Sequence, residues 1–177
     1  SSPSRGLGDV YKRQSEISSN QQYKTYYREI DGNKELVLDV NELAKDLDYF
    51  NLDSITPSPN NHYIAYAEDL SGRREYNIKI KNLETGQIID ESIEKSSGSV
   101  VWNKKNDTIY YALKDPVTLI ENKVFKHKVG TDTKEDILIY EEKDTEFHLH
   151  IFESRTKKYL NIYCLLYTSP SPRDGLL

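Results

Sequence analysis

The sequence predicts an all-β fold that is part of a β-propeller, and three observations support this prediction. Apolar and polar residues alternate with period 2 over most of the chain, in segments rich in Tyr, Ile and Val that clusters of Gly, Pro, Asn and Asp interrupt. Only one short segment has a helical pattern. A turn and a strand recur after about 45 residues, a period typical of propeller blades with four strands.

The first elements are expected in residues 15–48, which lead into the propeller as a hairpin and one short helix. The helical pattern covers residues 41–47. Asp39 or Asn41 could cap its N-terminus, because an Asp or Asn side-chain oxygen accepts hydrogen bonds from the free N–H groups of a first helical turn.

The strands of the partial propeller are expected in residues 49–163. The clearest strand places Tyr76, Ile78 and Ile80 on one face and polar residues on the other. A polar turn that ends in Gly joins this strand to residues 87–89 as a hairpin. The other expected strands cover residues 62–68, 99–102, 108–113, 123–129, 136–141, 147–152 and 159–163.

The repeat decides between two all-β architectures. An Asn-rich turn and an aromatic strand at residues 59–66 match those at residues 104–111, and a third copy starts at Thr156. The interval between copies has room for four short strands, which make one blade. A β-sandwich, the alternative, has strands every 8 to 12 residues or so and does not require this period. We therefore expect about two to two and a half blades.

Both ends of the chain are interpreted as translated sequencing adapter. Residues 4–14 (SRGLGDVYKRQ) and 164–173 (CLLYTSPSPR) can be encoded by the two strands of one DNA sequence, which resembles a transposase adapter. Two unrelated protein termini have no reason to be related in this way. We therefore expect residues 1–14 and 164–177 to be adapter-derived and to lie outside the native fold. Residues 15–163 would then be an internal fragment of a longer protein, which agrees with the absence of Met.

Composition argues against several classes of partner and site. With 24 Lys and Arg against 29 Asp and Glu, the chain has a net charge of −5 and no Lys/Arg-rich stripe, so no nucleic-acid partner is expected. No apolar run approaches the roughly 18 to 20 residues of a membrane helix, so no membrane partner is expected. The single Cys, Cys164, belongs to the predicted adapter. His148 and His150 could share a strand face at a metal-binding spacing, but a polar strand face is favoured, and we expect no metal and no cofactor.

Five phrases of the sequence resemble the first blades of oligopeptidase B, within the prolyl oligopeptidase family of serine peptidases. They are residues 67–76 (AEDLSGRREY), 98–102 (GSVVW), 114–119 (KDPVTL), 126–131 (KHKVGT) and 139–144 (IYEEKD). They follow the order and spacing of the family from about residue 35 to residue 162. Proline-specific members share part of this pattern, but RREY and DPVTL favour oligopeptidase B.

The resemblance implies a serine oligopeptidase that joins a seven-bladed propeller to an α/β-hydrolase domain of the same chain. Such an enzyme is cytoplasmic and cleaves short peptides after Lys or Arg, and its propeller restricts entry to small substrates. The catalytic Ser needs a Gly-x-Ser-x-Gly turn, which this sequence lacks, so we expect no activity and no catalytic residue in the present chain. A stand-alone propeller that serves as a binding scaffold is the alternative.

Two pairs of charged residues are candidates for function. A protease that selects cationic side chains needs carboxylates near its cavity, and Glu141 and Glu142 lie in an acidic cluster. By the resemblance, Glu142 aligns with a propeller residue that reaches the substrate cavity, and Glu141 is the weaker candidate. A solvated turn between two blades is the alternative. Arg73 and Arg74 could contact acidic groups of the hydrolase domain and hold the two domains together, or form an exposed basic turn.

Overall fold

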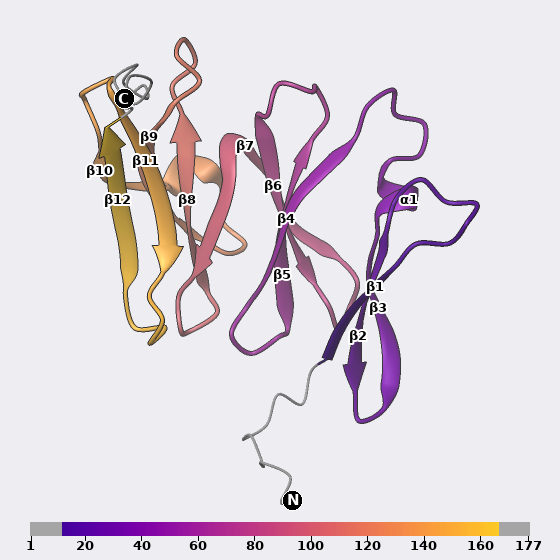
Figure 1. Ribbon diagram of the computed structural model, residues 1–177. Coiled ribbons are helices and arrows are strands. Elements are labelled where there is room, and N and C mark those ends of the chain that lie inside the picture. Colours follow the sequence, from indigo (N-terminus) through magenta and orange to yellow (C-terminus); the bar gives the residue numbers. More distant parts are fainter. Residues whose placement is uncertain (1–11, 167–177) are drawn as a thin grey trace, which may run out of the picture. The chain divides into compact units, whose positions relative to one another are not determined.

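The computed structural model describes residues 12–166, and the chain divides into two compact units between Phe50 and Asn51 (Figure 1). Apart from one α-helix and one 3₁₀-helix, the regular elements of the described residues are strands, so the predicted all-β fold is confirmed. Neither helix is long and apolar enough to span a membrane.

The first unit contains a three-stranded antiparallel sheet in the order β1-β2-β3. Strand β1 covers Lys12–Glu16, β2 covers Thr25–Ile30 and β3 covers Asn33–Asp39. The hairpin turn between β2 and β3 consists of Asp31 and Gly32, which have positive φ angles of 49° and 80°. Two successive residues of this kind match the type I′ turn that suits a two-residue hairpin. In the described part of this unit, the buried apolar residues are Val37, Leu38, Val40 and Phe50.

The predicted helix forms as α1, Val40–Leu43, and is shorter than expected. Asp39 caps it, because its Oδ1 accepts a hydrogen bond from the backbone N–H of Asn41 at 3.0 Å. Beyond Leu43 the chain forms a tight turn, and Asp46 has a left-handed φ of 61°. A residue in that conformation cannot continue a right-handed helix, so the prediction that the helix extends to residue 47 is wrong.

The second unit contains two antiparallel sheets. Strands β4 to β10 form one sheet in the order β10-β9-β8-β7-β6-β5-β4, and β11 and β12 form another. The bounds are Asn51–Pro57 for β4, Tyr63–Asp69 for β5, Tyr76–Asn82 for β6, Ile88–Trp102 for β7, Thr108–Lys114 for β8, Glu121–Lys128 for β9, Ile137–Glu141 for β10, Phe147–Glu153 for β11 and Leu160–Leu166 for β12.

The long strand β7 divides the larger sheet into two blades. Its first part pairs with β6 and its second part with β8, and Ser96 pairs with both. Lys95 and Gly98 have left-handed φ angles of 58° and 89°, which turn the backbone from one blade into the next. Gly suits position 98 because a φ of 89° is strained for a residue with a Cβ, and a Cβ there would also lie 3.1 Å from the ring of Tyr76.

The strand order therefore gives two complete blades and the start of a third. Blade 1 consists of β4, β5, β6 and the first part of β7, blade 2 of the second part of β7 with β8, β9 and β10, and blade 3 begins with β11 and β12. In Figure 1, β7 passes between β6 and β8 at this division. The predicted repeat of four strands and the expected two to two and a half blades agree with this arrangement.

Apolar side chains fill the space between successive blades. Alternation along β7 directs Val100 and Trp102 into the core shared with blade 1 and Val101 into the core shared with blade 3. The first core also holds Ala65, Ala67, Tyr76, Ile78, Ile80, Ile93, Ile109 and Tyr111, and the second Ala112, Val124, Leu149 and Ile151. Complete burial of one Ile contributes about 1.5 to 3 kcal/mol, so these cores hold the blades together.

All three blades share one turn after their innermost strand, at Ser58, Asn103 and Ser154. In each copy the backbone N–H of this residue donates to the carbonyl oxygen five positions later at 2.9 Å, and its own carbonyl accepts the N–H three positions later. Its side-chain oxygen also accepts the N–H five positions later in every copy. The sequence repeat is thus a repeat of hydrogen bonds, and the third copy confirms the start of blade 3.

Lys157→Asn is expected to raise the free energy of unfolding by about 0.5 to 1 kcal/mol. Asn61, Asn106 and Lys157 occupy equivalent positions in the three turns, with φ angles of 58°, 63° and 54°. Asn tolerates this left-handed conformation better than Lys, because its short polar side chain bonds to the local backbone. Urea unfolding measures the change, and Lys158→Asn is the control that leaves stability unaltered. A destabilised Lys157→Asn variant would contradict the argument.

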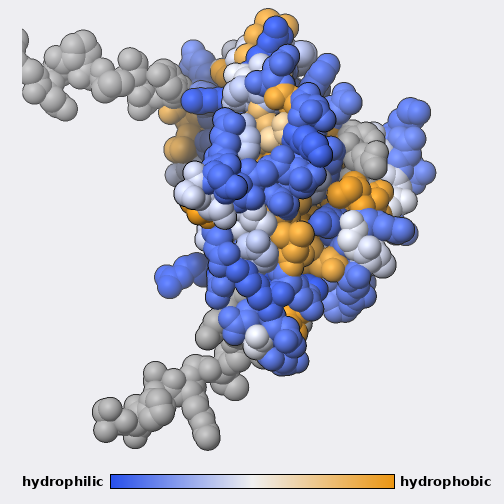
Figure 2. Space-filling model, turned by 90° about the vertical axis from the view of Figure 1, so that its right-hand side faces the viewer, coloured by the Kyte–Doolittle hydropathy of each residue, from blue (hydrophilic) through white to orange (hydrophobic). Residues whose placement is uncertain are grey.

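The structure contains three elements that the sequence pattern did not indicate. One is strand β1, which extends the expected hairpin of β2 and β3 to three strands. Strand β4 has a bulge between Leu52 and Ser54, which breaks the alternation that marks a strand. The 3₁₀-helix η1, Thr133–Glu135, is capped by Asp132, whose Oδ1 accepts the N–H of Lys134 at 2.9 Å. Outside the cores, hydrophilic side chains predominate on the face drawn in Figure 2, and hydrophobic ones form separate groups.

Both ends of the described chain include residues that are predicted to be adapter-derived. Strand β1 contains residues 12–14 and pairs with β2, and β12 contains residues 164–166 and pairs with β11. The remaining parts of the two predicted adapter segments, residues 1–11 and 167–177, lie outside the described residues. The assignment stays a prediction.

Candidate functional site

A pocket of about 240 Å³ lies at one end of blade 2, between the β8-β9 loop and the segment that joins β10 to β11. Its lining residues are Asp115, Thr118, Ile120, Asn122, Glu141, Glu142, Lys143, Asp144, Thr145 and Phe147. Four of them are carboxylates and one is a lysine, so the pocket is strongly negative. We call it the acidic pocket. It brings both predicted glutamates together with Asp115, from another loop.

Glu142 is held in place by hydrogen bonds to both of its carboxylate oxygens. Its Oε1 accepts the backbone N–H of Asp144 at 3.0 Å, and its Oε2 accepts the hydroxyl of Tyr140 at 2.9 Å. The bond from Asp144 and then the bond from Tyr140 lower the pKa of Glu142, because both stabilise its charged form. Each oxygen of a carboxylate can accept a second bond, so Glu142 can still receive a cationic donor.

Asp115 is fixed in the loop between β8 and β9. Its Oδ1 accepts the backbone N–H groups of Thr118 and Val117, both at 2.9 Å, and these bonds lower its pKa. The backbone of Asp115 also bonds to Leu119 and Ile120, which closes the loop on itself. This Asx turn keeps a second ionised carboxylate at the edge of the pocket.

Glu141 and Asn122 contribute in different ways. Lys123 Nζ lies 3.5 Å from Glu141 Oε1, and both side chains are more than a third exposed, so the pair contributes about 0 to 1 kcal/mol and partly neutralises Glu141. Asn122 Oδ1 is buried beside the pocket and has no hydrogen-bond partner within the described part of the chain. It is an acceptor that N–H donors of a ligand could satisfy.

Arg73 and Arg74 lie on the β5-β6 loop, at the same end of the blades as the acidic pocket, and both are exposed. The backbone of Arg74 is fixed by two hydrogen bonds. Its N–H donates to Asp69 Oδ2 at 2.8 Å, and its carbonyl accepts a bond from Lys114 Nζ. Burial raises the pKa of Asp69, but the hydrogen bonds that it accepts from Ser71 and Arg74 outweigh burial, so its pKa lies below the ordinary value. The two guanidinium groups thus project from a rigid loop.

The acidic pocket can recognise a ligand by charge. Fixed, ionised carboxylates attract a basic side chain, and a carboxylate binds a guanidinium through two parallel hydrogen bonds. Its described lining residues include no Ser, Cys or His that could act as a nucleophile or a general base. Recognition of a cationic group is therefore the chemistry that this geometry supports.

The histidines lie outside this pocket. His127 is fully buried, and its Nδ1 lies 2.7 Å from Asp136 Oδ1, which agrees with the structural interpretation of this residue. His148 and His150 lie on β11 on either side of the buried Leu149. In residues 12–166, no group of three or more His, Cys, Asp or Glu is placed to hold a metal ion.

Sequence reasoning named Glu141 and Glu142 as candidates but did not name Asp115, which lines the same pocket, or Tyr140, which bonds to Glu142. The phrase Asp-Pro-Val-Thr at residues 115–118 carried a usable signal, because Asp followed by Pro and Thr is typical of an Asx turn that fixes the carboxylate. The bond between Tyr140 and Glu142 has no such signal. These residues lie two positions apart where β10 ends, and only the geometry of the strand end brings their side chains together.

Comparison with known sequences gives a consistent result. Residues 9–171 match the family model for the prolyl oligopeptidase N-terminal beta-propeller domain. The chain is 38% identical over 129 residues to dipeptidyl aminopeptidase BI of Pseudoxanthomonas mexicana, covering 73% of this chain and 18% of that protein. It is 32% identical over 163 residues to Protease 2 of Moraxella lacunata, covering 84% of this chain and 23% of that protein. The chain thus spans about a fifth of the length of these relatives.

Solved structures show the same likeness. Oligopeptidase B from Leishmania major superposes with a TM-score of 0.83 at 26% identity, over 88% of this chain and 23% of that one. Oligopeptidase B from Trypanosoma brucei, in a closed form with covalently bound antipain, gives a TM-score of 0.79 at 27% identity, over 89% of this chain and 22% of that one.

Proposed function

The chain belongs to the prolyl oligopeptidase family through its N-terminal β-propeller domain, and we propose that the full-length protein is a serine oligopeptidase that cleaves short peptides after Lys or Arg. One observation carries the proposed preference: the acidic pocket has four carboxylates against one lysine, and Glu142 has a lowered pKa. A basic peptide is the substrate that such a surface attracts. The likeness to two oligopeptidases B supports the same class.

In this proposal the propeller has two tasks in a cytoplasmic enzyme. It restricts access to the catalytic site, so that only short peptides enter, and Glu142, with Glu141 beside it, contacts basic side chains of the substrate. The catalytic Ser, Asp and His belong to an α/β-hydrolase domain of the same parent chain. Arg73 and Arg74, exposed on their rigid loop, contact that domain.

A second candidate activity is release of dipeptides from a free N-terminus. The relative from Pseudoxanthomonas mexicana is named a dipeptidyl aminopeptidase, and its identity of 38% exceeds the 32% of Protease 2. The two activities make different demands on the substrate. A dipeptidyl aminopeptidase needs a free α-amino group two residues before the cleaved bond, and an oligopeptidase does not.

The full-length protein is expected to cleave an N-acetylated octapeptide with one internal Arg, and to leave matched peptides with Pro or Leu at that position intact. Chromatography and mass spectrometry of the products measure the cleaved bond. A peptide that is identical except for a free N-terminus separates the two candidates, because a dipeptidyl aminopeptidase would cleave only this one.

The 177-residue chain is the control in this experiment. Its sequence has no Gly-x-Ser-x-Gly turn, so we expect no product from it. Cleavage after Pro alone by the full-length protein, or no cleavage of any peptide, would overturn the proposed function.

A further inference from the structure

The seam between blades 1 and 2 is closed by contacts at the turn end of the blades. Trp102, at the end of β7, stacks on Tyr63 of blade 1 with ring centroids 6.2 Å apart, and its Nε1 donates to Thr56 O at 2.9 Å. The neighbouring turns are also joined, because the backbone N–H of Asn60 donates to Asn106 Oδ1 at 2.9 Å. These contacts leave the seam filled.

The equivalent seam between blades 2 and 3 lacks the groups that make these contacts. By the shared turn, Glu153 stands in the position of Trp102, and Lys157 stands in the position of Asn106. The carboxylate of Glu153 cannot stack on an aromatic ring as Trp102 stacks on Tyr63. The ammonium group of Lys157 cannot accept the hydrogen bond that Asn106 accepts. A pocket of about 140 Å³ lies there, which we call the seam pocket.

The seam pocket is basic and partly aromatic. Its lining includes Lys104, Lys157 and Lys158. The aromatic residues Trp102, Tyr110 and Tyr159 also contribute to the lining, but the ring of Trp102 packs in the core shared with blade 1. None of the three lysines forms an ion pair with a carboxylate of the described residues. Glu153 is the one acidic residue in the lining, so the pocket keeps a positive charge although the whole chain has a net charge of −5.

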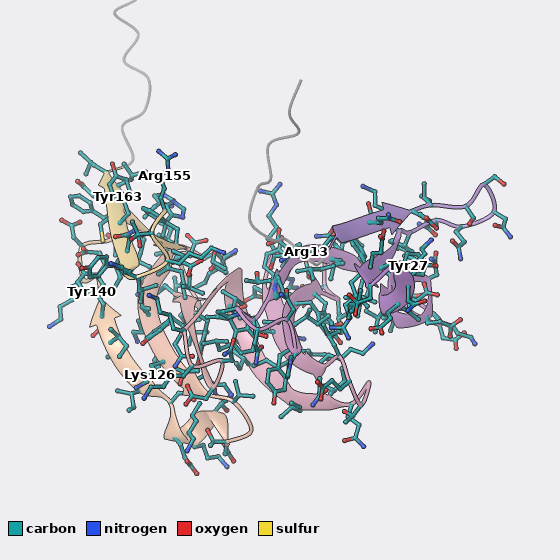
Figure 3. All side chains as sticks on the ribbon, turned by 90° about the horizontal axis from the view of Figure 1, so that it is seen from below. Arg13, Tyr27, Lys126, Tyr140, Arg155 and Tyr163 are labelled. Carbon is teal, nitrogen blue, oxygen red and sulfur yellow. The ribbon has the colours of Figure 1, made fainter. Side chains whose placement is uncertain are left out.

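The surroundings of the seam pocket strengthen this charge. The β7-β8 turn also carries Lys105, whose charge Asp107 of the same turn partly offsets, and the β11-β12 turn carries Arg155, which Figure 3 labels. Both turns lie at the end of the blades opposite to the acidic pocket, since β8 runs from one end to the other. The equivalent turn of blade 1, residues 58–62, has no Lys or Arg.

We propose that the seam pocket binds the phosphate group of a small phosphate monoester. Lysine ammonium groups bind phosphate as point charges, and a monoester carries about −1.5 to −2 charges at neutral pH, more than a carboxylate. A pocket of 140 Å³ is close to the roughly 150 Å³ cavity that holds one benzene ring, so it has room for one phosphate or one ring. This site lies apart from the acidic pocket and goes beyond the proposed peptidase function.

Phenyl phosphate is a suitable probe, with inorganic phosphate and phenol for comparison. Binding is measured by isothermal titration calorimetry, as the saturable change in heat on titration. In the full 177-residue chain, phenyl phosphate is expected to give a saturable change, inorganic phosphate a weaker saturable effect, and phenol none.

Variants with matched charge test where binding occurs. The double variant Lys104→Gln/Lys158→Gln is expected to raise the Kd for phenyl phosphate at least about tenfold, and Glu153→Gln to lower it. Lys105→Gln/Arg155→Gln removes two charges from the same two turns outside the pocket lining, and it should change the Kd less than about twofold. Circular dichroism melts of each variant show that it is folded.

Three results would overturn the proposal. The first is the absence of a saturable change with phenyl phosphate in the folded chain. The second is an equal rise in Kd for Lys105→Gln/Arg155→Gln and for Lys104→Gln/Lys158→Gln, which would indicate attraction by the net charge of the turns. The third is equal binding of phenol and phenyl phosphate, which would indicate an apolar site.

Discussion

Replacing Asp136 by Ala is expected to lower the free energy of unfolding of the chain by about 3 to 5 kcal/mol. The two carboxylate oxygens of Asp136 have different buried partners: Oδ1 lies 2.7 Å from His127 Nδ1, and Oδ2 accepts the hydroxyl of Tyr111 at 2.7 Å. The side chains of His127 and Asp136 are 0% and 3% exposed, so water cannot replace either bond. Truncation would leave both partners buried with a lost bond.

The position of Asp136 explains why this loss affects a whole blade. Tyr111 lies on β8, His127 on β9, and Asp136 immediately before β10, so one carboxylate joins three strands of blade 2. Burial, and then the bond to Asp136, raise the pKa of Tyr111 above its ordinary value of 10.0. A raised pKa means that this stabilisation is complete below pH 10 and is lost at higher pH, so unfolding should be measured near pH 7.

Two variants serve as references for Asp136→Ala. Asp136→Asn keeps the shape of the side chain and removes its charge, and it should cost less, about 1 to 3 kcal/mol. Asp132→Ala removes an exposed carboxylate from the same loop and should cost less than about 1 kcal/mol. If the free energy of unfolding of Asp136→Ala lies within about 1 kcal/mol of that of the unaltered chain, the bonds of Asp136 to Tyr111 and His127 do not stabilise blade 2.

The second large effect is expected from Trp102→Ala, which should lower the free energy of unfolding by about 3 to 5 kcal/mol. Trp102 is 6% exposed, and its ring lies in the core between blades 1 and 2. Removal would leave a cavity beside Tyr63 and would remove the hydrogen bond to Thr56 O. Trp102→Phe keeps one ring, loses the bond to Thr56 and leaves a smaller cavity than Ala does, so it should cost less, about 1 to 3 kcal/mol.

Tyr159 provides the matched control for Trp102. It occupies in blade 3 the position that Tyr63 occupies in blade 1, but it is 68% exposed. Tyr159→Ala should therefore alter the free energy of unfolding by less than about 0.5 kcal/mol. If urea unfolding gives the same loss of unfolding free energy for Trp102→Ala and Tyr159→Ala, the ring of Trp102 does not hold blades 1 and 2 together.

The strands and the blade repeat could be predicted from the sequence because their signals are local. Tyr76, Ile78 and Ile80 alternate with polar residues, and the structure buries all three. The turns after Ser58 and Asn103 carry Asn at the position that needs a left-handed backbone, and this recurrence marks the blades. Strand β4 was not predicted, because its bulge interrupts the alternation of apolar and polar residues.

The sites were less predictable because they join loops that are distant in sequence. Glu142 was found through a resemblance, but Asp115 reaches the same pocket only because β9 and β10 return the chain to the end of β8. The seam pocket is a stronger example. Its lysines come from turns about 50 residues apart, and neither turn by itself forms the Lys/Arg-rich stripe for which a sequence is searched.

The most direct test of the acidic pocket as a substrate contact is a double-mutant cycle between Glu142 and the peptide. The full-length protein and its Glu142→Gln variant would each be assayed on two peptides with Arg before the cleaved bond. One peptide has a second Arg beside the first, and the other has citrulline, a neutral residue of the same shape, in its place. Glu146→Gln, in the same acidic cluster but outside the pocket lining, is the control.

We expect kcat/KM of the unaltered protein to favour the second Arg over citrulline, and Glu142→Gln to reduce this preference by about tenfold, which corresponds to a coupling energy of about 1.4 kcal/mol. Glu146→Gln should leave the preference unchanged. The opposite result, in which Glu142→Gln lowers kcat/KM equally for both peptides or for neither, would show that Glu142 does not contact the basic side chain.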